Sequence, residues 1–171
     1  MKKVVFFIAL SCVFLFSACS KSGIKSFRGD YSFKTSGSVT IQRVTLPFDT
    51  ITPPAITFSL PNEIGQLEIT TLDKEHDSVL MVMNYLNNEV VVAQGCCKDN
   101  ELIMKSFTRD ALNFNVDSDL SFKAPVKVRA HGRLYDEDLL IIDMSYSGIA
   151  MVGPLYYHIE GDDIKMVANR N

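Results

Sequence analysis

Val126-Lys127-Val128-Arg129-Ala130-His131 is the stretch that decides the fold class of this chain. Apolar side chains occupy every second position in it, and the positions between them are basic or hold histidine. Successive side chains of a β-strand point to opposite faces, so the pattern predicts a strand with one apolar face and one charged face. Membrane-spanning barrels are polar inside and apolar outside, whereas this charged face favours water outside and a dry interior.

The same alternation continues on both sides of this strand. It returns over residues 140–146 after the acidic turn 136–138, and it precedes the strand over residues 112–116. Apolar runs bounded by turn residues predict further strands at 31–35, 39–41, 56–60, 67–70, 79–85, 89–97, 101–107, 155–159 and 164–169.

The connections between these segments are rich in turn-forming residues. Asn87-Asn88 predicts a two-residue hairpin turn, because asparagine tolerates positive φ. Further turns are predicted near Arg109-Asp110 and at residues 160–163, and the prolines of residues 44–54 predict an edge connection. We therefore expect an all-β fold, an antiparallel meander of about 8 to 10 strands that closes into a barrel or a sandwich.

The first 18 residues have the layout of a bacterial export signal, which we expect to form a helix and to be removed. Lys2 and Lys3 precede an uncharged apolar run over residues 4–16. A membrane-spanning helix needs roughly 20 apolar residues, so the shorter run makes a permanent transmembrane anchor the weaker alternative.

Ser17-Ala18-Cys19 ends this run and resembles the lipobox of bacterial lipoproteins. In that motif the signal is cut before the cysteine, which then carries acyl chains. The resemblance implies that Cys19 is lipidated and holds the protein to a membrane. Phe16 departs from the motif, which usually has leucine three places before the cysteine. Cleavage before Cys12 and ordinary secretory cleavage near Ala18 are the alternatives.

Removal of the signal leaves a short polar tether over residues 19–26 and a single domain over residues 27–171, long enough for a sizeable core. The formal charge changes from −3 to −5, because the signal contains two lysines and no acidic residue. A mildly acidic chain without a basic run argues against nucleic acid as a partner.

Few residues follow a catalytic or metal-binding pattern. Cys96 and Cys97 are adjacent, so in a strand their sulfur atoms point to opposite faces and are badly placed for a disulfide. They could form a soft-metal or redox pair, or pack as small apolar residues. His76, His131 and His158 lack the short spacings of zinc sites. The sequence has no nucleophile elbow, phosphate loop or dinucleotide motif, so we expect neither enzyme activity nor a cofactor or metal.

Four segments together resemble the lipocalin-like (calycin-like) lipoproteins of the Bacteroidetes. They are Gly29-Asp30-Tyr31, Gly65-Gln66-Leu67-Glu68-Ile69, Asp77-Ser78-Val79 and residues 161–168. The resemblance implies an up-and-down β-barrel with a ligand cavity. In classical lipocalins an arginine from the end of the barrel covers a tryptophan of the first strand; Tyr31 and Arg170 hold the matching positions, and we expect them to pack at one barrel end.

Surface lipoproteins of these bacteria often carry acidic residues just after the lipidated cysteine. None follows Cys19 directly, which favours the periplasmic side of the cell envelope.

Together these features predict a lipid-anchored periplasmic module that binds a small apolar ligand without catalysis. An eight-stranded barrel is wide enough for one small ligand or for its own side chains, so a packed core is the alternative for the interior. The alternative for function is an accessory lipoprotein whose outer barrel face binds another envelope protein. Methionines on strands would supply a pliable lining, and the expected lining residues are Met81, Met83, Phe114, Val128, Met144 and Tyr146.

Overall fold

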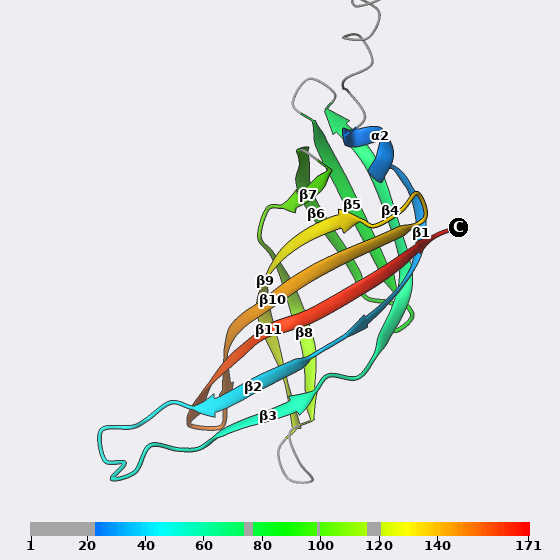
Figure 1. Cartoon of the computed structure of the whole chain (residues 1–171). Helices are drawn as coiled ribbons and strands as arrows, with labels where there is room; N and C mark the ends of the chain where they lie inside the picture. Colours follow the sequence, from blue (N-terminus) through cyan, green and yellow to red (C-terminus); the bar gives the residue numbers. More distant parts are fainter. Residues whose placement is uncertain (1–22, 74–76, 99, 116–120) are drawn as a thin grey trace, which may run out of the picture.

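The computed structural model describes residues 23–73, 77–98, 100–115 and 121–171, which form an almost entirely β protein (Figure 1). The predicted signal, the lipidation site Cys19, His76 and the turn at 117–119 lie outside these residues. The elements in chain order are α2 (Gly23–Phe27), β1 (Gly29–Ser36), β2 (Ser38–Arg43), β3 (Ala55–Ser59), β4 (Glu63–Asp73), β5 (Ser78–Tyr85), β6 (Val90–Lys98), β7 (Glu101–Met104), β8 (Phe107–Asn115), β9 (Ser121–Leu134), β10 (Leu139–Val152) and β11 (Leu155–Arg170).

The strands close into an antiparallel barrel of eight strands, which confirms the predicted fold class. Their order is β1-β4-β5-β6-β7-β9-β10-β11, and β11 pairs again with β1. β2 continues β1 beyond Gly37 and pairs with the first part of β11, and β3 pairs with β2 before the chain enters β4. β8 continues β7 and pairs with the first part of β9. Strands that follow one another in the chain are therefore neighbours, which makes the barrel an up-and-down meander.

β9 shows the alternation from which the fold class was predicted. Val126, Val128 and Ala130 are buried, whereas Lys127 and Arg129 are exposed. The inward-facing side chains of all the barrel strands join in one hydrophobic cluster. Burial of this cluster is the main stabilising contribution to the fold.

Two predicted turns are wrong, because their turn-forming residues lie within strands. Residues 160–163 belong to β11, which runs unbroken to Arg170; opposite them the pairing of β10 shifts between Met144 and Tyr146, as in a β-bulge. Arg109-Asp110 lies within β8, and the chain instead leaves the sheet at residues 105–106. A bulge places turn-forming residues in a strand without ending it.

α2 covers one end of the barrel. The sequence predicted a polar tether up to residue 26, but Gly23–Phe27 forms a short helix whose Ile24 and Phe27 are buried. Arg28 N donates a hydrogen bond to Ile24 O at 3.2 Å. We call this the α2 end of the barrel, and we call the opposite end, which holds the β2–β3 loop and the β10–β11 turn, the far end (Figure 1). No helix within the described ranges is long and apolar enough to cross a membrane.

Candidate functional site

The strand ladder of the barrel wall is interrupted toward its far end, because one hairpin is short. β5 and β6 have 8 and 9 residues, whereas β9, β10 and β11 have 14, 14 and 16. The predicted two-residue turn is wrong: Tyr85 N donates to Glu89 O at 2.9 Å, so the loop has three residues, Leu86-Asn87-Asn88, and only Asn88 has a positive φ. This β5–β6 turn lies partway along the barrel, and beyond it the wall lacks two strands (Figure 1). In the described part of the chain, β3 pairs only with β2 and β8 only with β9. We call this break in the strand pairing, between β3, β8 and the β5–β6 turn, the window.

A buried arginine closes the α2 side of the window. The Arg109 side chain is 1% exposed and forms bidentate ion pairs with Glu63 and Glu89. Nη1 and Nη2 donate to Glu63 at 2.7 and 2.9 Å, and Nε and Nη2 donate to Glu89 at 3.0 and 2.5 Å. Nη1 also donates to Tyr146 Oη at 3.3 Å across the barrel. All five N–H donors of the guanidinium are therefore used.

Aromatic rings support this cluster from the barrel interior. The Arg109 Cζ atom lies 4.4 Å from the centroid of the Tyr85 ring, a cation–π distance, and the Phe33 ring packs edge-on against Tyr85 with centroids 5.0 Å apart. Burial raises the pKa of Tyr85 and of Tyr146, so both hydroxyls stay protonated.

The guanidinium itself keeps its charge in this setting. Burial alone would lower the pKa of Arg109, but hydrogen bonds to Glu63 and Glu89 outweigh burial and raise the pKa above its ordinary value. One buried cation therefore meets two carboxylates, whose side chains are 23% and 24% exposed. The positive charge lies inside the wall, and the surplus negative charge faces the window.

A pocket of about 190 Å³ lies at the window, directly outside the two carboxylates. It is lined by Leu60, Pro61, Glu63, Asn87, Glu89, Leu112 and Asn113. Phe58 of β3 and Phe114 of β8 touch across the gap farther toward the far end, with ring centroids 6.4 Å apart. A cavity of about 150 Å³ lined by apolar residues is large enough for benzene, so this pocket has room for a small ring or a short aliphatic group.

The lining of the pocket combines an apolar wall with hydrogen-bond acceptors. Both carboxylates are held by Arg109, and the remaining lining side chains are apolar or amides. Leucine and proline side chains offer an apolar wall to one part of a ligand. The carboxylate and amide oxygens beside them accept hydrogen bonds from another part.

The six residues predicted to line a ligand cavity are all buried in the barrel interior. They are Met81, Met83, Phe114, Val128, Met144 and Tyr146. Two of them reach the window: Tyr146 contacts Arg109, and Phe114 contacts Phe58. Met144 borders a separate outer groove between β7, β9 and β10. None of the six lines the pocket at the window.

Tyr31 and Arg170, the predicted packing pair, meet at the α2 end. Arg170 Cζ lies 5.2 Å from the centroid of the Tyr31 ring, and Arg170 Nη2 donates to Tyr31 Oη at 2.7 Å and to the carbonyl of Ser26. Tyr31 Oη in turn donates to the carbonyl of Phe27 at 2.9 Å. These contacts join the first strand, the last strand and α2.

The residues with other chemical hypotheses do not assemble into a site. Cys97 is buried and Cys96 half-buried, and burial raises the pKa of Cys97 to about 12, so its thiol stays protonated near neutral pH. His131 Nε2 lies 3.0 Å from a carboxylate oxygen of Glu101 on the outer surface, and His158 is exposed. Within the described ranges, no group of three His, Cys, Asp or Glu residues could hold a metal ion.

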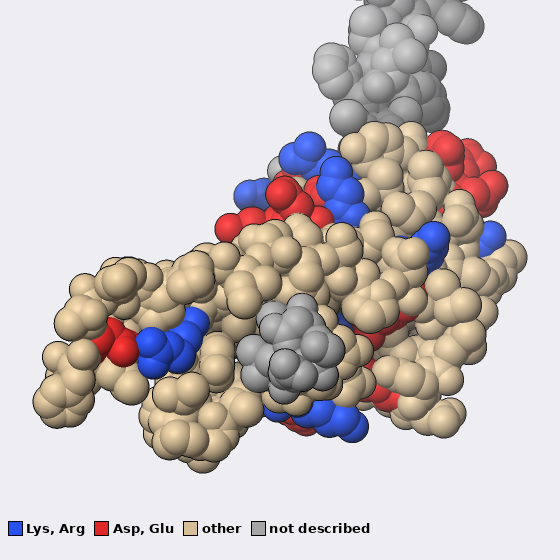
Figure 2. All heavy atoms as spheres, turned by 90° about the horizontal axis from the view of Figure 1, so that it is seen from below, with Lys and Arg blue, Asp and Glu red and all other residues tan. Residues whose placement is uncertain are grey.

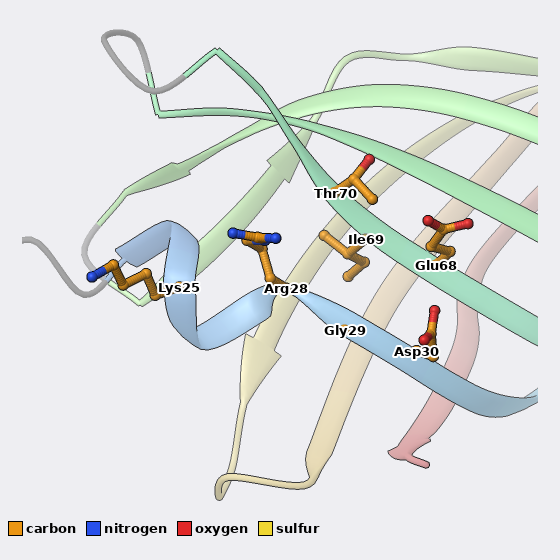
Figure 3. Close-up of a pocket in the computed structure, with 7 residues that line it drawn as sticks. All are labelled: Lys25, Arg28, Gly29, Asp30, Glu68, Ile69 and Thr70. Atoms are coloured by element: carbon orange, nitrogen blue, oxygen red, sulfur yellow. The ribbon is translucent and has the colours of Figure 1, made fainter.

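A second surface pocket, of about 480 Å³, lies beside α2 (Figure 3). Lys25 and Arg28 border it on one side, and Asp30 and Glu68 border it on the other, with Ile69 between them. Its charges are mixed, and its position places it at the end of the chain that carries the predicted anchor.

Sequence reasoning missed Arg109, Glu63 and Glu89. Arg109 follows Phe107 by two residues, so strand alternation places it on the same inward face. An inward arginine in a strand pattern was therefore a detectable signal. Its partners lie 20 and 46 residues away, and nothing local to the sequence relates them to it.

The fold and the window define a closed, up-and-down β-barrel of the lipocalin-like kind with a lateral pocket. A scan against models of protein families finds no match to this chain, and a search of curated proteins finds no relative.

Proposed function

We propose that this protein is a lipid-anchored periplasmic module that binds a small apolar ligand at the window and is related to the lipocalin-like lipoproteins of the Bacteroidetes. The observation that supports the ligand site most directly is the pocket of about 190 Å³ between Leu60 and Leu112. The barrel interior is filled by its own side chains near the predicted lining residues, so the proposed site lies in the wall.

The proposed ligand is small and has an apolar body. Leu60, Pro61 and Leu112 would contact that body, and Glu63, Glu89 and Asn87 would accept hydrogen bonds from a polar end. Arg109 acts as a positioning residue, because its five hydrogen bonds hold both carboxylates in place before a ligand arrives.

Benzene is a suitable probe for this site because of its size and its lack of charge. In a titration followed by methyl NMR, saturable shifts are expected at Leu60 and Leu112, with little change at Leu72, which is exposed in the last part of β4, away from the window. Leu60→Trp would fill the pocket and abolish the shifts, whereas Val167→Trp, at an exposed position of β11, serves as the matched control. Equal shifts in both variants would contradict the proposal.

The anchor has its own test. Mass spectrometry of the mature protein should find an acylated N-terminal Cys19, and a mature chain with an unmodified Cys19, or one that begins elsewhere, would rule the anchor out.

An accessory role as a protein-binding lipoprotein is the second candidate. Ile64, Leu86, Val90 and Val92 are exposed apolar side chains on the outside of β4, β6 and the β5–β6 turn. We call them the outer apolar face. Clustered exposed apolar side chains are typical of protein contacts. Photo-crosslinking from position 92 in whole cells should give one discrete product under this role, and Val90→Ser should weaken it.

A further inference from the structure

The far end of the barrel carries apolar side chains that the proposed ligand site does not use. Phe48 is 94% exposed and Ile51 is 81% exposed in the β2–β3 loop, and Met151 and Tyr156 are exposed beside the β10–β11 turn. Val44 N donates to Tyr156 O at 2.8 Å, which joins the loop to that hairpin. We call Phe48, Ile51, Met151 and Tyr156 the apolar tip.

The loop is built to hold its apolar residues outward. Asp49 N donates to Leu46 O at 3.0 Å, and Leu46 N donates to Asp49 Oδ2 at 2.7 Å, which closes a tight turn with Pro47 and Phe48 at its centre. Arg43 pairs with Asp49 at 3.1 Å and ties the turn to the end of β2. Because these contacts and the loop prolines restrict the chain, Phe48 need not lose much loop entropy on binding.

Few charged residues lie on the arm that holds the β2–β3 loop. Figure 2 shows the molecule from the far end, and uncharged residues cover most of the arm at the left, which holds the β2–β3 loop. The charged residues of the loop and the end of β2 are Arg43 and Asp49, which neutralise each other. The tip therefore offers neither a basic patch for anionic groups nor an acidic patch for cations.

The size and shape of the tip favour a lipid surface over a protein. A standard protein interface uses about 20 to 30 residues on each side, whereas the tip is a narrow projection with four apolar side chains. Shallow insertion into a bilayer needs only a few apolar side chains that reach past the headgroups. We propose that the apolar tip inserts into a lipid bilayer, as a contact separate from the anchor at Cys19.

The two lipid contacts would lie at opposite ends of the barrel. The predicted anchor precedes α2, and β11, which runs obliquely from the far end toward the α2 end, is alone roughly 50 Å long at about 3.3 Å per residue. This is the arrangement of a protein that bridges two lipid surfaces. Insertion of the tip depends on the apolar tip alone, whereas the bridge between two lipid surfaces rests also on the proposed anchor at Cys19; neither depends on the pocket at the window.

The chain contains no tryptophan, so a single substitution provides a specific reporter. Phe48→Trp in the full chain is mixed with vesicles of phosphatidylcholine, alone or with the anionic phosphatidylglycerol. Insertion predicts that tryptophan emission shifts to shorter wavelength and is quenched by brominated lipid, to the same extent with both vesicle types. The matched control is Val92→Trp on the outer apolar face, which should show neither change.

Adding Ile51→Ser to the Phe48→Trp chain should weaken partitioning of the protein into vesicles about tenfold, since it removes one apolar side chain that insertion would bury in the bilayer. Unchanged emission at position 48 would overturn the proposal and leave a protein partner for the tip. An equal shift at positions 48 and 92 would also overturn it, because contact would then not be specific to the tip. Binding only to anionic vesicles would overturn it by showing that charge drives the contact.

Discussion

Two arginines, each over a tyrosine ring, close two different parts of the barrel. At the α2 end, Arg170 covers Tyr31 and hydrogen-bonds to neutral oxygens, those of the tyrosine and of a backbone carbonyl. At the window, Arg109 covers Tyr85 and is held by two carboxylates. The half-buried Arg170 retains contact with water, whereas the fully buried Arg109 requires charged partners.

The difference between the two arginines follows from whether paired strands close the barrel at each place. The α2 end is closed by the pairing of β1 with β11 and by α2, so Arg170 Nη2 needs only neutral acceptors there, and Nε is buried without a hydrogen-bond partner among the described residues. At the window no strand is available, and the Arg109 cluster instead joins β4, the β5–β6 turn, β8 and β10 through side chains. Side-chain contacts there take the place of backbone hydrogen bonds between strands, and a pocket lies beside them.

Removal of Arg109 should be the most damaging single change. Arg109→Met leaves Glu63 and Glu89 without their cation in a partly buried position. We expect the free energy of unfolding to fall by about 3 to 5 kcal/mol, measured by urea denaturation. Arg170→Met is the matched change at the other end and should cost clearly less; equal losses would mean that the two arginines have the same role.

Neutralising one partner should make Arg109 more like Arg170. Glu89→Gln keeps the shape of the side chain but removes one charge, and we expect a loss of about 1 to 3 kcal/mol in the free energy of unfolding. Glu101→Gln, in an exposed ion pair with Arg133, is the control and should leave stability close to that of the unchanged protein. A Glu89→Gln protein as stable as this control would show that the ion pair at the window is dispensable.

Substitution of each tyrosine by phenylalanine should separate the contribution of ring stacking from that of hydrogen bonding. Tyr31→Phe removes hydrogen bonds with Arg170 and Phe27, so we expect a loss of about 1 kcal/mol in thermal or urea unfolding. Tyr85→Phe keeps the ring beneath Arg109 and, among the described residues, loses only a weak contact with the sulfur of Met83 at 3.9 Å, so it should cost less. The reverse order would assign the stabilisation at the window to the Tyr85 hydroxyl.

The reaction rates of cysteine thiols should show a difference in water access between the two regions, a change that leaves the fold itself least affected. The buried Cys97 near α2 has its pKa raised to about 12 from 9.0, so at pH 8 its thiol should react with a disulfide reagent far more slowly than a cysteine placed at the window by Leu60→Cys.

The pH dependence has a definite sign. Above pH 9.0 the unfolded chain releases the Cys97 proton while the folded protein retains it up to about pH 12. This contribution to stability is therefore full below pH 9 and is lost as the pH rises to about 12. A Cys97→Ser protein should lack this part of the decline, and a decline unchanged by the substitution would assign it to other groups.

Most strands were predictable because their signal is local. The alternation in β9 and β10 depends on neighbouring residues only, and Asn88 adopts the positive φ that its place in the β5–β6 turn predicted. Residues 160–163 and Arg109-Asp110 misled because turn-forming residues also occur at bulges. The window cluster was missed because an arginine can face a core only when distant partners neutralise it, and the sequence pattern around Arg109 contains no record of Glu63.

The sequence by itself determined that the chain is β and which face of each strand turns inward. A period of two along a strand is a property of the backbone, and it needs no knowledge of neighbours. Tertiary structure decided that the meander closes as a barrel, through pairing of residues 31–36 with 165–170, and that the short β5–β6 hairpin leaves a window. Closure and the window depend on how strands of unequal length meet across the barrel, a relation between residues far apart in the chain.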